Sequence, residues 1–246
     1  MKATELLTQS LNFYGRVFNK VFWLSVASSV SPLLMVAFIG PEGISALGLF
    51  VVSLVSMFFS IYMLAFIHQF SKEQDDSLGE AFQATLKKFM PMVLTSFVFG
   101  LFTMLVAIPG AIIGGIFSAG IEDEQMKALL IALVAMIPVS FYLYRCFFAV
   151  YFTLTNGLGP IDALKASNAL TKKNPFIFRA FLLLSAVMLV YFVLLLLVGH
   201  MIAVGTMAIG ILEFALQVMV MPFFTIFIYR MYEVALEQRP QNIEEE

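Results

Sequence analysis

The sequence predicts an all-α polytopic membrane protein with six transmembrane helices, three cytoplasmic amphipathic helices and a single membrane domain over residues 1–246. The first reason is composition: 61% of the residues are hydrophobic and 12% are charged, with a mean hydropathy of +0.95. A soluble domain carries roughly 25% charged and 45–50% apolar residues and could not bury this much apolar surface. The second reason is that long stretches hold no charge, as between Lys88 and Glu122 and between Arg179 and Glu213. Uncharged stretches of about 18 residues or more are typical of transmembrane helices.

These stretches divide into six spans, each near the roughly 20 residues that a bilayer requires. The predicted spans are Val21–Ile39, Ile44–Ile67, Met90–Ala119, Ala128–Phe152, Phe176–Val198 and Val204–Ile228. About 20 residues of mixed polarity precede the first span, so we expect an uncleaved helix there rather than a signal peptide. The third span contains Pro109-Gly110 and Gly114-Gly115, which favour one kinked helix over two half-helices. Gly110 and Gly114 also match the GxxxG pattern of close helix contacts, for which packing within the chain is favoured over dimerisation.

The positive charges set the predicted orientation. Of the 14 Lys and Arg residues, Lys127 alone lies in the segments on one side of the membrane, and Arg145 falls within a span. All the others lie in the segments on the opposite side. An excess of Lys and Arg marks the cytoplasmic face, whereas Asp and Glu follow no such rule. Both termini are therefore predicted to be cytoplasmic.

A cytoplasmic amphipathic segment precedes each odd-numbered span. The apolar faces of the first two segments consist of Leu7, Leu11, Tyr14 and Phe18, and of Leu78, Phe82, Leu86 and Phe89. Ser77 and Glu80 have capping-box spacing at the start of the second segment, and Pro160 suits the first position of the third, with Lys172 and Lys173 in its last turn. The chain thus reads as a threefold repeat with units 1–75, 76–158 and 159–246. The alternative is that each entry into the membrane simply uses an interfacial helix and a basic stop.

Basic residues accompany the apolar faces of these segments. The candidates for contact with lipid headgroups are Arg16, Lys20, Lys87, Lys88, Lys172 and Lys173. A basic helix with an apolar face can lie in the headgroup plane and favour anionic lipid. The alternative is that these helices pack against the transmembrane bundle and frame its loops.

The third amphipathic segment, residues 159–174, carries a resemblance to a known family. Its matching residues are Ala163, Leu164, Ser167, Leu170, Thr171, Lys172 and Asn174. The stretch resembles one found ahead of the fifth span in YciC-like bacterial inner-membrane proteins, and similar stretches occur in the membrane domain of some glycerophosphodiester phosphodiesterases. The resemblance implies a six-helix protein of the bacterial inner membrane. The chain has no phosphodiesterase domain, so no such activity is implied.

Polar residues within the spans are the candidates for a functional site. Arg145 in the fourth span, and Glu213 and Gln217 in the sixth, stand out because such residues usually face the bundle interior. Three interpretations remain open for Arg145: its side chain reaches the cytoplasmic headgroups, it forms a structural ion pair with Glu213, or it belongs to a substrate or proton route. His68 and His200 are predicted on opposite faces and Cys146 is the only cysteine, so we expect no metal site, cofactor, disulfide or catalytic residue.

These observations favour a non-enzymatic inner-membrane protein of the cell envelope that contacts or handles lipids, or acts as a scaffold. The expected partners are membrane lipids and other inner-membrane proteins, and a net charge of -2 gives no reason to expect nucleic acid. The main alternative is a small transporter or channel with a polar route near Glu213, Arg145 and Gln217. A membrane enzyme acting on lipid headgroups is a third hypothesis.

Overall fold

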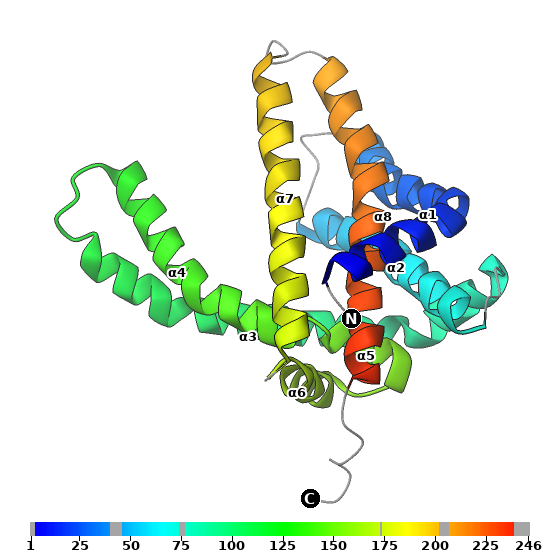
Figure 1. Cartoon of the computed structure of the whole chain (residues 1–246). Helices are drawn as coiled ribbons and strands as arrows, with labels where there is room; N and C mark the ends of the chain where they lie inside the picture. The colour runs from blue at the N-terminus through cyan, green and yellow to red at the C-terminus, as the bar shows by residue number, and fades with distance from the viewer. Residues whose placement is uncertain (1–2, 40–45, 74–76, 173, 202–206, 239–246) are drawn as a thin grey trace, which may run out of the picture. The chain divides into compact units, whose positions relative to one another are not determined.

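The computed structural model describes residues 3–39, 46–73, 77–172, 174–201 and 207–238, with side chains described outside 31–47, 73, 192 and 194–213. In these ranges the chain forms eight α-helices and no strand (Figure 1). The helices are α1 (Ala3–Ile39), α2 (Ala46–Glu73), α3 (Leu78–Phe117), α4 (Glu124–Cys146), α5 (Ala149–Asn156), α6 (Pro160–Thr171), α7 (Pro175–Met201) and α8 (Met207–Glu237). The prediction of an all-α chain is confirmed for this part of the sequence.

Several helices are long and apolar enough to cross a membrane, as expected of a helical membrane protein. Four candidates lie in the described residues: Gly48–Lys72, Leu78–Phe117, Glu124–Asn156 and Phe214–Glu237. The number rises to five if α6 and Pro175–Tyr191, which are bent by 98° at the break after Thr171, are counted as one span. The first predicted span, Val21–Ile39, lies within α1, but its second half falls outside the described side chains. The number of six spans therefore stays a prediction.

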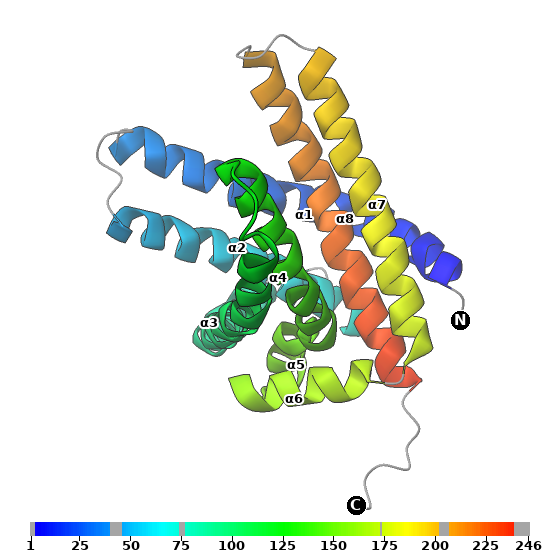
Figure 2. The ribbon, with the colours of Figure 1, turned by 90° about the vertical axis from the view of Figure 1, so that its left-hand side faces the viewer.

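The helices group into two compact units. The first unit, Met1–Phe89 with Pro175–Glu246, contains α1, α2, the start of α3, α7 and α8. In it α1 packs against α2 and α8, and α7 and α8 lie side by side (Figure 2). The second unit, Met90–Asn174, contains the rest of α3 with α4, α5 and α6. There α4 and α5 both pack against α6.

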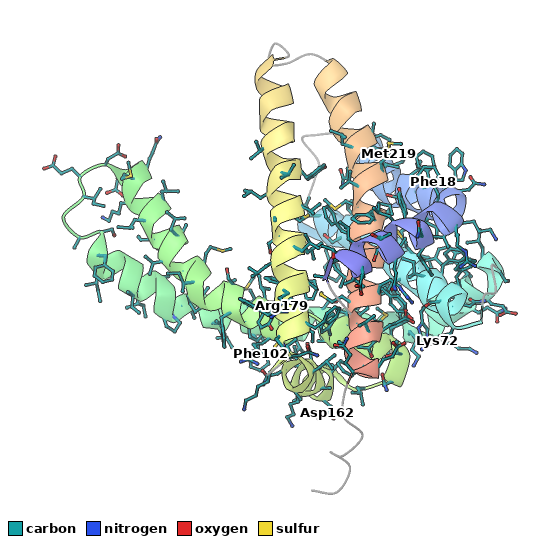
Figure 3. All side chains as sticks on the ribbon, viewed as in Figure 1. Phe18, Lys72, Phe102, Asp162, Arg179 and Met219 are labelled. Atoms are coloured by element: carbon teal, nitrogen blue, oxygen red, sulfur yellow. The ribbon has the colours of Figure 1, made fainter. Side chains whose placement is uncertain are left out.

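The core of the first unit forms where α1, α2 and α8 meet. Its fully buried side chains include Leu6 and Val21 of α1, Phe66 and Ile67 of α2, and Phe227 and Tyr232 of α8. Another link joins α1 to α8, because the Tyr14 hydroxyl donates to the carbonyl of Met219 at 2.7 Å; Figure 3 labels Met219 on α8. Burial of about 25 cal/mol per Å² of apolar surface stabilises such a core.

The amphipathic segments differ from the prediction in how they continue. The first two are the N-terminal parts of the continuous helices α1 and α3, whereas the third is a separate helix, α6. In α1 the buried face is the one with Leu6, Val17 and Val21, while Leu11 and Phe18 of the predicted apolar face are 51% and 37% exposed. The reason is that this segment of α1 has apolar side chains on two faces. One face packs in the core of the first unit, and the other face remains exposed.

Helix α3 confirms the prediction of a single helix, since it runs through Pro91 and Pro109 to Phe117. Gly110 and Gly114 lie directly against α4. A Cβ atom at Gly110 would be 2.7 Å from Cα of Ala135, and one at Gly114 would be 2.8 Å from Cα of Ile131. The small residues thus allow close approach of two helices within the chain, as favoured from the sequence.

The predicted span Ala128–Phe152 lies within the candidate span Glu124–Asn156, and its helix is interrupted at Phe147 and Phe148, where α4 ends and α5 has not yet begun. Periodicity could not reveal this break, because the residues on both sides of it, apart from Arg145, are apolar or aromatic. The expected cap is present at Ser77, whose Oγ accepts from the Glu80 N–H at 3.4 Å. Pro160 is at the start of α6 as predicted, but the helix ends at Thr171, so Lys172 is its C-cap and not part of its last turn.

Candidate functional site

The break between α4 and α5 is held by hydroxyl groups of α6. In a continuous helix each backbone N–H bonds to the carbonyl four residues earlier. Here the Phe148 N–H instead donates to Oγ of Ser167 at 2.9 Å, and Ser167 donates to the carbonyl of Arg145 at 3.0 Å. The Thr171 hydroxyl also donates to the Arg145 carbonyl, at 3.1 Å. Because Phe148 is fully buried, these bonds satisfy backbone groups that water does not reach.

The family-like motif is therefore the face of α6 that holds this break. Its buried members are Ala163, Leu164, Ser167, Leu170 and Thr171. Their spacing of i, i+1, i+4, i+7 and i+8 places them on one side of a helix. The two remaining members lie outside this face: Lys172 is exposed and Asn174 is half-buried.

A tight connection brings α6 back against α4 and α5. It begins at Gly157, the C-cap of α5, which has a φ of 66° and donates its N–H to the Thr153 carbonyl at 3.1 Å. This left-handed conformation favours glycine, because a Cβ atom would be strained there. The Thr153 hydroxyl also lies 2.9 Å from that of Thr95, which ties α5 to α3.

A groove of about 480 Å³ lies between α3, α4 and α6 beside this break. We call it the Arg145 groove. Its lining residues are Phe102, Val106, Pro138, Phe141, Tyr142, Arg145, Cys146, Ile161, Leu164, Lys165 and Asn168. Most of this surface is apolar, and Arg145, Lys165 and Asn168 supply its charged and amide groups. Figure 3 labels Phe102 on α3 and Asp162 on α6.

The Arg145 guanidinium carries the chemistry of the groove. Its Cζ lies 5.1 Å from the centre of the Phe141 ring and 6.0 Å from that of Tyr144, in cation–π contact. Its Nε and Nη1 atoms are buried and have no hydrogen-bond partner among the described residues. Among the described residues Lys165 forms an exposed pair with Asp162 at 3.7 Å, which contributes little and leaves its ammonium group able to turn to an anion. The groove thus combines an apolar wall with positive hydrogen-bond donors.

The other predicted intramembrane residues lie elsewhere. Gln217 is exposed on α8, in the first unit. The side chain of Glu213 lies outside the described residues, so its predicted ion pair with Arg145 stays a prediction. The same holds for any role of His200.

The predicted headgroup contacts divide into two groups. Arg16 and Lys20 lie over aromatic rings of α2, with Arg16 Cζ 5.5 Å from the centre of Phe70 and Lys20 Nζ 5.9 Å from that of Phe66. Of the other four residues, Lys87 and Lys172 are exposed and Lys88 is half-buried. Lys173 lies outside the described residues.

Sequence reasoning missed a buried polar cluster around Glu233 in the first unit. Glu233 is 7% exposed, and its carboxylate accepts hydrogen bonds from Ser71, Tyr229 and Arg230. The Tyr229 hydroxyl is also 2.7 Å from Nδ1 of His68. A usable signal was the spacing of Tyr229, Arg230 and Glu233, which puts them within one helical turn. Among the described residues, no group of three or more His, Cys, Asp or Glu side chains could hold a metal ion.

Comparison of the chain with protein-family models, curated proteins and solved structures gives no match. The chemistry of the Arg145 groove is nevertheless specific. A largely apolar hollow with a guanidinium in its lining suits an amphiphile with an anionic group, because Arg pairs strongly with phosphate and carboxylate oxygens.

Proposed function

We propose that this chain is a non-enzymatic protein of the bacterial inner membrane that binds anionic lipid in the Arg145 groove, and that it belongs to the YciC-like family. The observation that carries the proposal is the guanidinium of Arg145 in a largely apolar groove of about 480 Å³, where two of its buried donor atoms lack a partner among the described residues. Burying a charged group without a partner is unfavourable, and a lipid phosphate reached by a change of rotamer supplies the missing acceptor.

The two kinds of surface in the groove match the two parts of a phospholipid. Phe102, Val106 and Phe141 present apolar surface suited to an acyl chain. Arg145 and Lys165 supply positive charge for the headgroup, and Asn168 adds an amide donor. A zwitterionic lipid offers the same phosphate with an added cation, so we expect a preference for lipids with net negative charge.

The amphipathic segments support a lipid environment for the rest of the chain. Leu11 and Phe18 of α1 leave an apolar stripe outside the packed core, as do Phe82 and Leu86 of α3, at 41% and 56% exposure. Exposed apolar surface of this extent marks contact with a membrane or a partner. Our proposed topology has six spans with both termini in the cytoplasm, following the distribution of Lys and Arg.

The test is lipid binding by the full chain in nanodiscs. Native mass spectrometry would compare retention of phosphatidylglycerol and phosphatidylcholine by the wild type and by Arg145→Gln. The substitution removes the charge and keeps a polar side chain. A hydrogen bond to a charged group is worth about 1.5–3 kcal/mol, so the retention of phosphatidylglycerol should fall roughly ten- to hundred-fold.

Arg179→Gln is the matched control, because Arg179 is an exposed arginine outside the groove. It should keep the wild-type preference. An equal loss of lipid binding in both variants would show that the effect depends only on net charge. No loss of lipid binding in either variant would refute lipid binding at Arg145. Ion flux through reconstituted wild-type protein that Glu213→Leu abolishes would favour the transporter hypothesis instead.

A further inference from the structure

A second hollow, of about 270 Å³, lies in the first unit where α1, α2 and α8 meet. We call it the N-terminal cup. Its lining residues are Gln9, Asn12, Phe13 and Arg16 of α1, Phe70 and Ser71 of α2, and Arg230 of α8. It shares no residue with the Arg145 groove and lies in the other compact unit. Unlike that groove, it gathers two guanidinium groups and two side-chain amides.

Arg230 is fixed at the wall of the cup by the buried Glu233. Nη1 of Arg230 donates to Oε2 of Glu233 at 2.5 Å, and the Ser71 hydroxyl lies 2.9 Å from both carboxylate oxygens. Lys72 adds a further positive charge, with Nζ 3.8 Å from Oε1 of Glu233; Figure 3 labels Lys72 on α2. This arrangement makes Arg230 a rigid part of the wall.

Glu233 does not make the cup electrically neutral. Its side chain is 8% exposed, and its oxygens already accept bonds from Ser71, Tyr229 and Arg230. The positive charges to compare with this one carboxylate are those of Arg16, Arg230 and Lys72. The side chain of Arg16 has no ion pair among the described residues, and its one contact of note is the cation–π contact with Phe70 at 5.5 Å. Among the described residues that line the cup or pair with Glu233, positive charges therefore outnumber negative ones.

Donor groups without partners point the same way. Nε of Arg230 is buried and has no hydrogen-bond partner among the described residues, although Nη1 of the same group is paired. The amides of Gln9 and Asn12 are exposed on the same wall of α1, one turn apart. Arginine forks and amide N–H groups are the donors that bind phosphate oxygens.

We infer that the N-terminal cup binds a phosphate group, with Arg16 and Arg230 as its charged contacts and Asn12 as a neutral donor. The volume is below the roughly 300–1,000 Å³ of ordinary ligand sites, so the cup fits a single phosphate-bearing head and not a large molecule. The phosphate comes either from a soluble phosphomonoester or from the headgroup of a lipid such as phosphatidic acid. The chemistry of recognition is the same in both cases.

The experiment separates these two sources. Isothermal titration calorimetry of the full chain in detergent would use glycerol 1-phosphate as the soluble probe, with glycerol as its uncharged counterpart. The lipid arm would compare binding of phosphatidic acid in nanodiscs by native mass spectrometry. Both arms would use the wild type, Arg16→Gln and Arg179→Gln, because Arg179 is an exposed arginine of the same unit outside the cup.

Arg16→Gln should weaken binding of the effective probe at least tenfold, and Arg179→Gln should leave it within twofold. Arg230→Lys provides a second variant, because it keeps a partner for Glu233 while removing the guanidinium fork. Loss in the soluble arm assigns the site to a phosphomonoester, and loss in the nanodisc arm alone assigns it to a lipid headgroup. Unchanged binding in Arg16→Gln, or no binding of either probe by the wild type, would overturn the inference. Arg145→Gln should not alter the soluble arm. The nanodisc arm is measured in an Arg145→Gln background, which removes lipid bound in the Arg145 groove and keeps this result separate from the test of that groove.

Discussion

Removing one hydroxyl group, in Ser167→Ala, should destabilise the junction of α4, α5 and α6. The Ser167 hydroxyl accepts the N–H of Phe148 and donates to the carbonyl of Arg145. Alanine leaves the Phe148 N–H buried without an acceptor, whereas the Arg145 carbonyl keeps its bond from Thr171. An unsatisfied buried donor costs about 1–3 kcal/mol, so we expect a loss of that size in the free energy of unfolding.

The assay is reversible unfolding by SDS in mixed micelles, followed by circular dichroism. Ser140→Ala is the matched control, because Ser140 is exposed on α4 and its change should fall within about 0.5 kcal/mol of the wild type. Ser167→Ala combined with Thr171→Val removes both donors from the Arg145 carbonyl, and should cost more than the two single changes added together. A single Ser167→Ala variant as stable as Ser140→Ala would refute the assigned role of this hydroxyl.

The same substitution has a functional consequence, because Ser167 does not line the Arg145 groove. It acts on Arg145 only through the main chain at the helix break. Ser167→Ala should therefore reduce the preference for phosphatidylglycerol while leaving every group in the groove chemically intact. Unchanged lipid preference in a destabilised variant would show that the break does not position the guanidinium.

The remaining predictions concern packing, topology and the sixth span. Gly114→Ala should destabilise the chain in the same SDS assay, because its Cβ would lie 2.8 Å from the α4 backbone, while Gly115→Ala, with no atom within 4 Å, should not. Single cysteines would replace the exposed residues Glu124 and Asp162 in a cysteine-free background. In intact cells an impermeant maleimide should label the cysteine at position 124 and not the one at position 162. The reverse labelling pattern would overturn the orientation. Glu213→Gln should leave the SDS midpoint nearly unchanged, because the amide keeps the shape of a protonated acid; strong destabilisation would favour a structural ion pair.

The sequence was sufficient for features that depend on local chemistry. The start of α6 at Pro160 and the cap at Ser77 follow from residues within one turn of each other. The continuity of α3 through Pro109 was predictable, because a helix in an apolar medium retains most of its hydrogen bonds around one proline. The sequence could also predict that another helix approaches closely at Gly114, because small residues at i and i+4 leave room for a neighbouring helix.

Features that depend on long-range contact could not be derived in this way. The break at Phe148 is stabilised by Ser167, which lies 19 residues further along the chain, and nothing in the apolar stretch around Phe148 signals it. Likewise, the face of α1 that packs in the core could not be chosen from its pattern, because both Leu6 and Leu11 lie on apolar faces. In a membrane protein the hydrophobic pattern separates polar from apolar surface, but it does not separate helix contacts from lipid contacts, because lipid tails are as apolar as the side chains.

This limit also explains why the N-terminal cup was missed while Arg145 was found. Arg145 was conspicuous because a charge within an apolar stretch is rare. Arg16, Lys72 and Arg230 lie at the ends of spans, where the same charges are expected and signal only orientation. Lys72 and Arg230 meet at Glu233, which also accepts a bond from Ser71, 162 positions away, and Arg16 lines the cup together with Arg230. A basic residue at a helix end therefore has two functions that sequence cannot separate: it sets the topology of the chain, and it can form an anion site where several helices end together.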